Sequence, residues 1–312
     1  MVKRFTFEVL IMGNVVVIGS LNYDVSVYCE SFPNTGETIL SDSIGFSSGG
    51  KGGNQAVSAF KAGANTKIIG CIADDLYGKE IVKKLKEDGI DTSHLKISQK
   101  FNTGTALIEI DKEGNNRICV YPGANLDLNI EDLEKVKELI DESDVVLLQN
   151  ELNIKTVIET IKLAKKQNKI VVYNPAPFVE IDDSILKQVD YIVPNQTELD
   201  LLTEKGKSLE EKVDSLLLKG VKNVVVTLGK DGVYYKGENG VITLSALKVD
   251  VVDTVGAGDC FCGYLAACIS DKNDIMTSLK ISSVAASIKC TKKGAQNGTP
   301  QIKEVKDFIS KR

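Results

Sequence analysis

The chain has 312 residues, of which 43% are hydrophobic, so it is long enough for one large α/β domain or two small ones with a real core. Its formal net charge is −5 with Lys and Glu intermixed, which argues against a nucleic-acid-binding surface. No apolar run reaches the ~18 residues of a membrane span, and the seven scattered cysteines are typical of reduced thiols. These features indicate a cytoplasmic globular protein that binds neither nucleic acid nor membrane.

Hydrophobic periodicity predicts alternating strands and helices in the first half of the chain. In chain order these are a strand at 14–20, a helix at 53–64, a strand at 66–73, a helix at 77–89 and a hairpin at 103–122. Residues 1–12 precede the first strand and are expected to be an N-terminal extension, which leaves a single domain at 13–312. The segments at 35–48 and 103–122 alternate polar and apolar residues, which is typical of a half-exposed sheet. We therefore expect a small separate β lid from about 22–48 and 101–123.

The second half of the chain continues the alternation. In chain order it shows a helix at 130–140, strands at 144–150, 169–176, 190–195 and 222–229 with helices at 155–168 and 208–220 between them, a hairpin at 231–244, and two or three C-terminal helices. Continuous Val and Ile runs between amphipathic helices indicate a mostly parallel sheet covered on both faces. The predicted fold is therefore a three-layer α/β/α domain with a small β-sheet lid.

The stretch "GFSSGGKGGNQ" at 45–55 nearly matches a phosphate-binding loop. Gly45, Gly50 and Lys51 fit G-x-x-x-x-G-K-[ST], but Gly52 stands where a Ser or Thr hydroxyl should hold Mg²⁺. The pattern alone allows either an altered nucleotide loop or a glycine-rich turn that binds something else.

The stretch "VVDTVGAGDCFCG" at 251–263 is the strongest chemical signal. Free N–H groups at a helix start that is opened by glycines form an anion site. Asp259 in that first turn suits a general base for a hydroxyl that approaches the anion, or it merely favours the helix dipole.

Three other places carry polar groups at strand ends. Asn195 and Glu198 are spaced to share one metal or phosphate, or to form an ordinary capping box. The turn at 226–232 suits a ligand at the end of a parallel strand, or a plain hairpin. Asn22 and Asp24, together with Glu151, suit a polyhydroxy ligand, although each alone is an ordinary strand-end residue.

The chain resembles the ribokinase/phosphofructokinase B family of sugar kinases, continuously from about 13 to 311. The signatures "GGKGGNQAVSAFKAGA" and "DTVGAGDCFCGYLAA" carry the resemblance, and "GSLNYD", "PGANLDL", "NPAP", "PNQTE" and "KKGAQ" indicate its ribose-phosphorylating branch. It implies transfer of the ATP γ-phosphate to the 5-hydroxyl of D-ribose, with Asp259 as general base and the amides of Gly256, Ala257 and Gly258 around the phosphoryl group. Ribose would be read by Asn22, Asp24, Gly50, Lys51, Asn54 and Glu151, so the near-match to a phosphate loop would be coincidental.

The resemblance also implies a nucleotide groove and two kinds of metal ion. Asn195, Thr227, Gly229, Gly232 and Gly258 would bind ATP, with Ser283 at the position that lies against adenine. Glu198 would organise Mg²⁺ through water. A K⁺ ion would activate the enzyme from a site formed by Asp253, Val255, Lys289, Lys292, Gly294 and Gly298, where Gly298 replaces a serine that often contributes.

Two alternatives remain open from the sequence. The acceptor of the same chemistry could be 2-deoxyribose, fructose, a nucleoside such as adenosine or pseudouridine, or a sugar phosphate. A non-catalytic sugar-binding protein on this fold is the other. The alternation in "TALIEI" (105–110) would leave an exposed apolar face in a monomer, so a homodimer through the β lid is expected.

Overall fold

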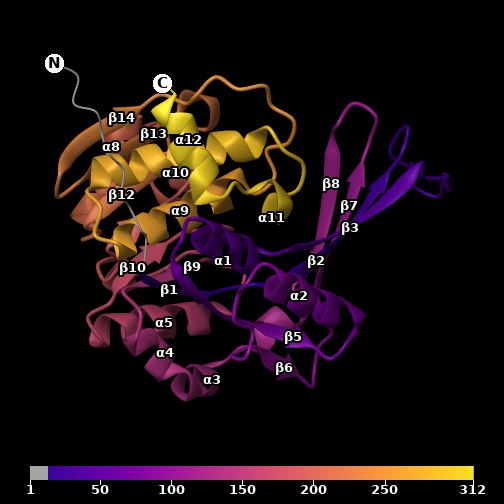
Figure 1. Cartoon of the computed structure of the whole chain (residues 1–312), viewed down its shortest axis with the longest axis horizontal. Coiled ribbons are helices and arrows are strands. Elements are labelled where there is room, and N and C mark those ends of the chain that lie inside the picture. The colour runs from indigo at the N-terminus through magenta and orange to yellow at the C-terminus, as the bar shows by residue number, and fades with distance from the viewer. Residues whose placement is uncertain (1–12, 312) are drawn as a thin grey trace.

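A sheet of eight strands forms the centre of the computed structural model, which describes residues 13–311 (Figure 1). The expected extension at 1–12 lies outside the described residues. In order across the sheet, the strands are β14 (Gly240–Leu244), β13 (Val233–Gly237), β12 (Asn223–Thr227), β11 (Tyr191–Ile192), β10 (Ile170–Tyr173), β9 (Val145–Leu148), β1 (Asn14–Ile18) and β4 (Asn65–Ile69). All neighbours from β12 to β4 are parallel, and β13 and β14 add an antiparallel hairpin.

Helices cover both faces of this sheet and bury two separate hydrophobic clusters. One cluster includes residues of α1 (Lys51–Lys61), α2 (Leu76–Glu87), α9 (Ala257–Ser270), α10 (Ile275–Cys290) and α12 (Ile302–Ser310). The other includes residues of α3 (Ile130–Lys135), α4 (Lys137–Asp141), α5 (Ile154–Lys166), α6 (Asp183–Leu186), α7 (Gln196–Leu202) and α8 (Leu209–Leu218). Successive residues of β1 divide between the two clusters because strand side chains alternate between faces. The predicted three-layer α/β/α fold is confirmed.

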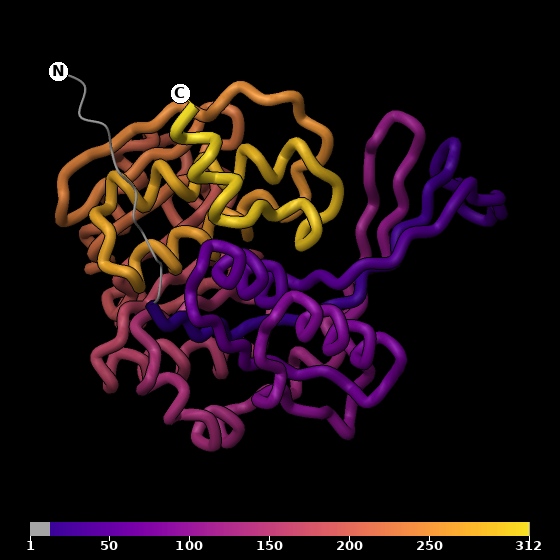
Figure 2. Tube along the Cα trace, viewed as in Figure 1, coloured from indigo at the N-terminus to yellow at the C-terminus, as the bar shows by residue number. Residues whose placement is uncertain are grey.

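A second, smaller sheet projects from the main body (Figures 1 and 2). Its strands, in order, are β3 (Ser43–Gly49), β2 (Asn22–Tyr28), β7 (Gly104–Ile110) and β8 (Asn116–Tyr121). We call these four strands the small sheet. Three residues separate β1 from β2, and only Gly50 separates β3 from α1, so the small sheet is joined to the carboxyl edge of the large one. The separate sheet that the alternating segments predict is therefore present.

Several element boundaries differ from those predicted. The strand expected at 66–73 is two strands, because the Gly70 carbonyl accepts a hydrogen bond from Lys96 and the chain turns away. Its second half, β5 (Cys71–Ala73), then pairs with β6 (Lys96–Ser98). The helix expected at 130–140 breaks into α3 and α4 at Val136, whose φ is −115°. No helix within residues 13–311 is long and apolar enough to cross a membrane.

Candidate active site

Polar side chains gather where the parallel strands of the large sheet end. Ser20 follows β1, Glu151 follows β9 and Asn174 follows β10. Asn195 follows β11 and forms an isolated parallel bridge with Thr227 at the end of β12. Ligands of open α/β sheets bind outside the carboxyl ends of the strands. The candidate site therefore lies at this edge, between the small sheet and the first turns of α1 and α9.

Asp259 lies in the first turn of α9 with only 8% of its surface exposed. The helix begins after Gly256, whose φ of 76° is a left-handed conformation that favours glycine. The Ala257 N–H donates to the Thr254 carbonyl at 3.1 Å, whereas within the described residues the N–H groups of Gly256 and Gly258 have no partner. Two of the three amides predicted to hold a phosphoryl group are therefore free to bind an anion at the positive end of the helix.

Two side-chain amides from α1 hold the Asp259 carboxylate. Asn54 donates from Nδ2 to Oδ2 at 2.9 Å, and Gln55 donates from Nε2 to Oδ1 at 3.0 Å. Each carboxylate oxygen can accept a second hydrogen bond, so a substrate hydroxyl can still reach it. The carboxylate is thus held in position by neutral donors and keeps accepting capacity for a further hydrogen bond.

Further buried amides support this pair, and the sequence did not reveal them. Gln149 donates to Oε1 of Gln55 at 2.6 Å, and Gln296 donates to Oδ1 of Asn54 at 3.2 Å. Gln55 and Gln149 are completely buried. Two glutamines in the sequence could have indicated this network: Gln55 in "GGNQA" and Gln149 directly after β9. Glutamines that become buried at such positions need polar partners.

Four charged groups of the predicted set converge beside Asp259. Burial, followed by the charges of Glu151 and Asp259, raises the pKa of Asp24 to about 7. The Asp259 charge raises the pKa of Lys51, and Glu151 and Glu198 act in the same direction. The backbone N–H of Lys51 also donates to Oε2 of Glu151 at 3.1 Å. The carboxylates of Glu151, Glu198 and Asp259, which are far apart in the sequence, therefore all act on Lys51.

Asn22 and Asp24 enter this group from β2. Asn125, in the 3₁₀ turn η1 (Gly123–Asp127), donates to Oδ1 of Asn22 at 2.8 Å and accepts from the Leu21 N–H at 2.8 Å. The Asp24 carboxylate lies over the Cα of Gly49, where a Cβ would come within 2.3 Å of Oδ2. Asn125 stands in the quoted "PGANLDL" motif but was not predicted as a site residue.

The glycine-rich stretch before and within α1 is not arranged as a phosphate loop. The Lys51 and Gly52 N–H groups donate to Glu151 and to the Ser20 hydroxyl, and the Gly53 N–H donates to the Ser20 carbonyl at 2.9 Å. A phosphate there would compete with a carboxylate for the same donors. Gly50, which precedes the helix, lies against the backbone of β2, where a Cβ would come within 2.7 Å of the Asn22 nitrogen.

Most of the predicted nucleotide residues lie where β11 and β12 end. Asn195 and Glu198 form a capping box at the start of α7, with hydrogen bonds of 2.8 and 2.9 Å between each side chain and the other residue's N–H. Burial raises the pKa of Glu198, while Lys51 opposes that shift. Gly229 begins the 3₁₀ turn η2 (Gly229–Asp231) between β12 and β13, and Gly232 follows it. The capping box that the sequence allowed at Asn195 and Glu198 is therefore present, and it uses only one carboxylate oxygen of Glu198.

Ser283 was predicted to lie against adenine, and no described contact connects it to the other predicted nucleotide residues. It lies on α10, and among residues 13–311 no partner is found for its buried hydroxyl.

The residues predicted to bind K⁺ lie together between α9, α10 and α11 (Ala295–Gly298), but one of them fills the space. Lys289 is fully buried and donates from Nζ to the Asp253 carbonyl at 2.8 Å. That carbonyl was predicted to be a ligand of the metal ion. The residues present therefore do not fit a bound K⁺ ion.

The profile of the pfkB family carbohydrate kinases matches residues 12–302. The chain belongs to this family. The ribokinase of Schizosaccharomyces pombe is 35% identical over 308 residues, which cover 94% of this chain and 97% of that protein. The deoxyribokinase of Salmonella typhi is 31% identical over 302 residues, covering 95% and 99%. The structure of Arabidopsis thaliana ribokinase complexed with ribose and ATP matches with a TM-score of 0.88 at 30% identity, covering 95% and 98%.

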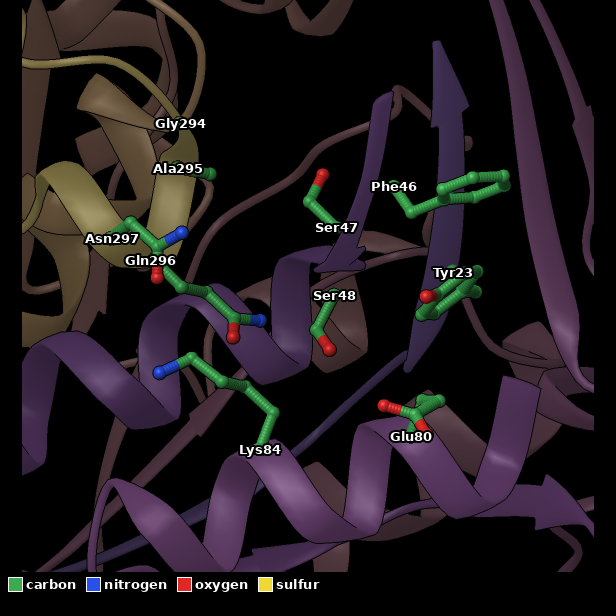
Figure 3. A pocket seen from close by; sticks show the side chains of 10 residues that line it. All are labelled: Tyr23, Phe46, Ser47, Ser48, Glu80, Lys84, Gly294, Ala295, Gln296 and Asn297. Carbon is green, nitrogen blue, oxygen red and sulfur yellow. The ribbon is translucent and has the colours of Figure 1, made fainter. Parts of the chain in front are cut away.

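Membership of the pfkB family confirms that the chain is a carbohydrate kinase. Figure 3 shows a pocket of this kinase between the small sheet, α2 and the 294–297 turn. Tyr23 and Phe46 line it from the face of the small sheet opposite to Asp24, because strand side chains alternate. None of the converging carboxylates lines this pocket, which meets the candidate site only at Gln296, the donor to Asn54.

Proposed function

We propose that this enzyme transfers the γ-phosphate of ATP to the 5-hydroxyl of D-ribose, giving D-ribose 5-phosphate and ADP. The observation that carries the proposal is the buried Asp259 carboxylate. It lies at a helix start with free N–H groups, is held by two neutral amides, and interacts with the charges of Asp24 and Lys51. The similarity to ribokinases across the whole domain supports ribose as the acceptor.

Asp259 acts as the general base in this proposal. The O5 hydroxyl gives its proton to the carboxylate as O5 attacks the γ-phosphorus, and the bond from phosphorus to the β-phosphate oxygen breaks to release ADP. Charge that develops on the phosphoryl oxygens is stabilised by the free N–H groups of Gly256 and Gly258. Phosphoryl transfer depends mainly on positioning and electrostatics, which this rigid turn supplies.

Asn22, Asp24, Lys51, Asn54 and Glu151 select the sugar. Asp24, with its raised pKa, can either donate or accept a hydrogen bond near neutral pH. A site with several buried polar groups discriminates strongly against a sugar that lacks a partner hydroxyl, because its own groups would be left unpaired. This argument favours ribose over 2-deoxyribose, despite the deoxyribokinase relative.

Asn195, Thr227, Gly229, Gly232 and Ser283 are proposed to line the ATP groove. Within the described residues no three His, Cys, Asp or Glu side chains group as a ready metal site. Glu198 has one carboxylate oxygen outside the capping box, which fits a water-mediated contact to Mg²⁺ carried by the nucleotide phosphates. Bound Mg²⁺ would neutralise phosphate charge. K⁺ has no part in the proposed reaction, because Lys289 occupies the expected site.

We also propose that 13–312 is one domain, with the small sheet as its lid, that the enzyme is cytoplasmic, and that it is a homodimer through the small sheet. Exposed apolar side chains on that sheet support the dimer.

A substrate screen tests the proposed function. ADP release is measured with ribose, 2-deoxyribose, fructose, adenosine and pseudouridine, each with MgATP. We expect the highest kcat/KM with ribose. A value about tenfold higher with any other acceptor would overturn the ribose assignment, since one recognised hydroxyl is worth at least that factor. No ADP release with any of them would favour the non-catalytic alternative.

A further inference from the structure

Lys289 is a buried charged side chain for which the proposed reaction has no use. It lies in the last turn of α10 and none of its surface is exposed. Its Nζ lies 2.8 Å from the Asp253 carbonyl oxygen and 3.7 Å from Oδ2 of the Asp253 carboxylate. A buried ammonium needs such compensation, and its placement therefore reflects a specific local requirement.

The surroundings of this lysine are backbone oxygens. A Cβ on Gly298 would lie 3.1 Å from the Lys292 carbonyl oxygen, 3.3 Å from the Lys293 carbonyl oxygen and 3.2 Å from Cε of Lys289. Carbonyl oxygens and the end of the lysine side chain thus meet at one point. A side chain at 298 would press against the lysine, so glycine at 298 and lysine at 289 suit each other sterically.

Asp253 connects this ammonium to the anion-binding turn. Its Oδ1 accepts from the Val255 N–H at 2.9 Å, and its Oδ2 accepts from the Gly294 N–H at 2.8 Å. Val255 immediately precedes Gly256, which opens α9. The Cys290 carbonyl also accepts from the Val252 and Asp253 N–H groups at 2.8 and 3.1 Å. Lys289 therefore supports the loop that presents the free amides.

We propose that the Lys289 ammonium is a built-in replacement for a monovalent metal ion, so that this kinase needs no K⁺. The inference rests on the proposed function for its effect on turnover, but not for its effect on stability. A metal ion at the Asp253 carbonyl would lie beside a like charge, and the Asp253 carboxylate is the only acidic group that the described contacts place there. Lys289 is a positioning residue: it acts on the phosphoryl group only through the 253–258 loop.

The first experiment uses the wild-type enzyme. Turnover with ribose and MgATP, and the Tm of the ligand-free protein, are measured in KCl, NaCl and choline chloride at equal ionic strength. Equal ionic strength removes general screening, so we expect kcat/KM to agree within about twofold and Tm within about a degree across the three salts. A rise in either quantity specific to K⁺ would overturn the proposal. The Tm measurement needs no substrate, so it decides the proposal even if ribose is not the acceptor.

The second experiment removes the charge. Lys289→Met keeps the length of the side chain, and we expect kcat to fall about tenfold or more with an unchanged KM for ribose, because the amides lose their fixed position. Lys289→Ala opens space among the carbonyls, so K⁺ or methylammonium should raise its Tm and kcat more than Na⁺ does. Lys280→Ala, at an exposed position on the same helix, is the matched control. If Lys289→Met retained wild-type kcat, or if folded Lys289→Ala responded equally to K⁺ and Na⁺, the proposal would be wrong. If Lys289→Ala does not fold, the wild-type salt series and Lys289→Met still decide it.

Discussion

Neutral amides hold the carboxylate of Asp259, the base in the proposed reaction. Asp259 accepts from Asn54 and Gln55, and both amides are themselves held by further glutamines, Gln296 and Gln149. A guanidinium in place of these amides would pair with the carboxylate and compete with the substrate proton. Amides fix the orientation of the carboxylate without that competition.

Asp259→Asn should therefore keep ribose binding and lose turnover. The amide cannot accept the O5 proton, and a positioned base contributes ~10²–10⁴-fold to kcat. Calorimetric titration with ribose and steady-state ADP release measure the two effects separately. Asp271→Asn, at the other end of α9, is the control and should behave as wild type. Retention of more than about a tenth of wild-type kcat would remove Asp259 from the role of base.

Asp24→Asn should make stability less dependent on pH. The folded-state pKa of Asp24 is raised from 3.8 to about 7, so folding favours its protonated form. As pH rises from about 4 to about 7 the unfolded chain loses this proton first, and the free energy of unfolding falls by roughly 1–3 kcal/mol. The asparagine variant lacks this penalty and should be the more stable protein at pH 8 but not at pH 4, while its KM for ribose rises.

Urea unfolding of both proteins at pH 4, 6 and 8 measures the effect. Asp42→Asn, an exposed carboxylate in the turn before β3, should change neither the pH dependence nor KM. An Asp24→Asn effect of the same size at all three pH values would contradict the raised pKa.

At the scale of elements, the sequence predicted order and type well but predicted boundaries and breaks poorly. Long Val and Ile runs such as β9 and β12 were correctly identified because burial on both faces leaves a strong pattern. The break between β4 and β5 depends on a hydrogen bond from Lys96, which is 26 residues beyond Gly70, and no local pattern records it. The alternating segment was predicted from residue 35 to 48, yet β3 begins only at Ser43.

The sequence predicted those parts of the candidate site that one residue or short motif indicates. It did not predict the supporting residues that are far away in the sequence. Asp259 and the 256–258 turn are visible in the sequence as a glycine-opened helix start. Gln149 is 94 residues away from Gln55, its hydrogen-bond partner, so their pairing appears only in the fold. Lys289 was placed in a potassium site by position alone, because the sequence does not show that its side chain turns back into that space.

At the scale of the whole molecule, the small sheet predicts assembly. Leu107 is 55% exposed and Phe46 57% exposed, and both lie on the face of the small sheet opposite to Asp24. The outer strands β3 and β8 also leave one edge each unpaired within the described sheet. Such a surface is typical of an interface, so we expect a homodimer at micromolar concentration.

Light scattering of the wild type and of Leu107→Lys measures this assembly. The charge should convert the dimer to a monomer, because an unpaired lysine in an apolar interface is costly. Leu218→Lys is the matched control, since Leu218 is 89% exposed on α8, a helix that packs on the large sheet. A monomeric wild type, or a Leu107→Lys dimer as tight as wild type, would show that this face is not the interface.

The cysteines of the small sheet and of α9 differ in a way that provides a reporter. Cys119 pairs with Leu107 across β7 and β8 and is the one exposed cysteine among residues 13–311. Burial raises the pKa of Cys260, Cys262 and Cys268, so these thiols stay protonated and unreactive. A maleimide should therefore label the native chain at Cys119 first, without engineered cysteines, and the rate of that labelling would follow the covering and uncovering of the small sheet in solution.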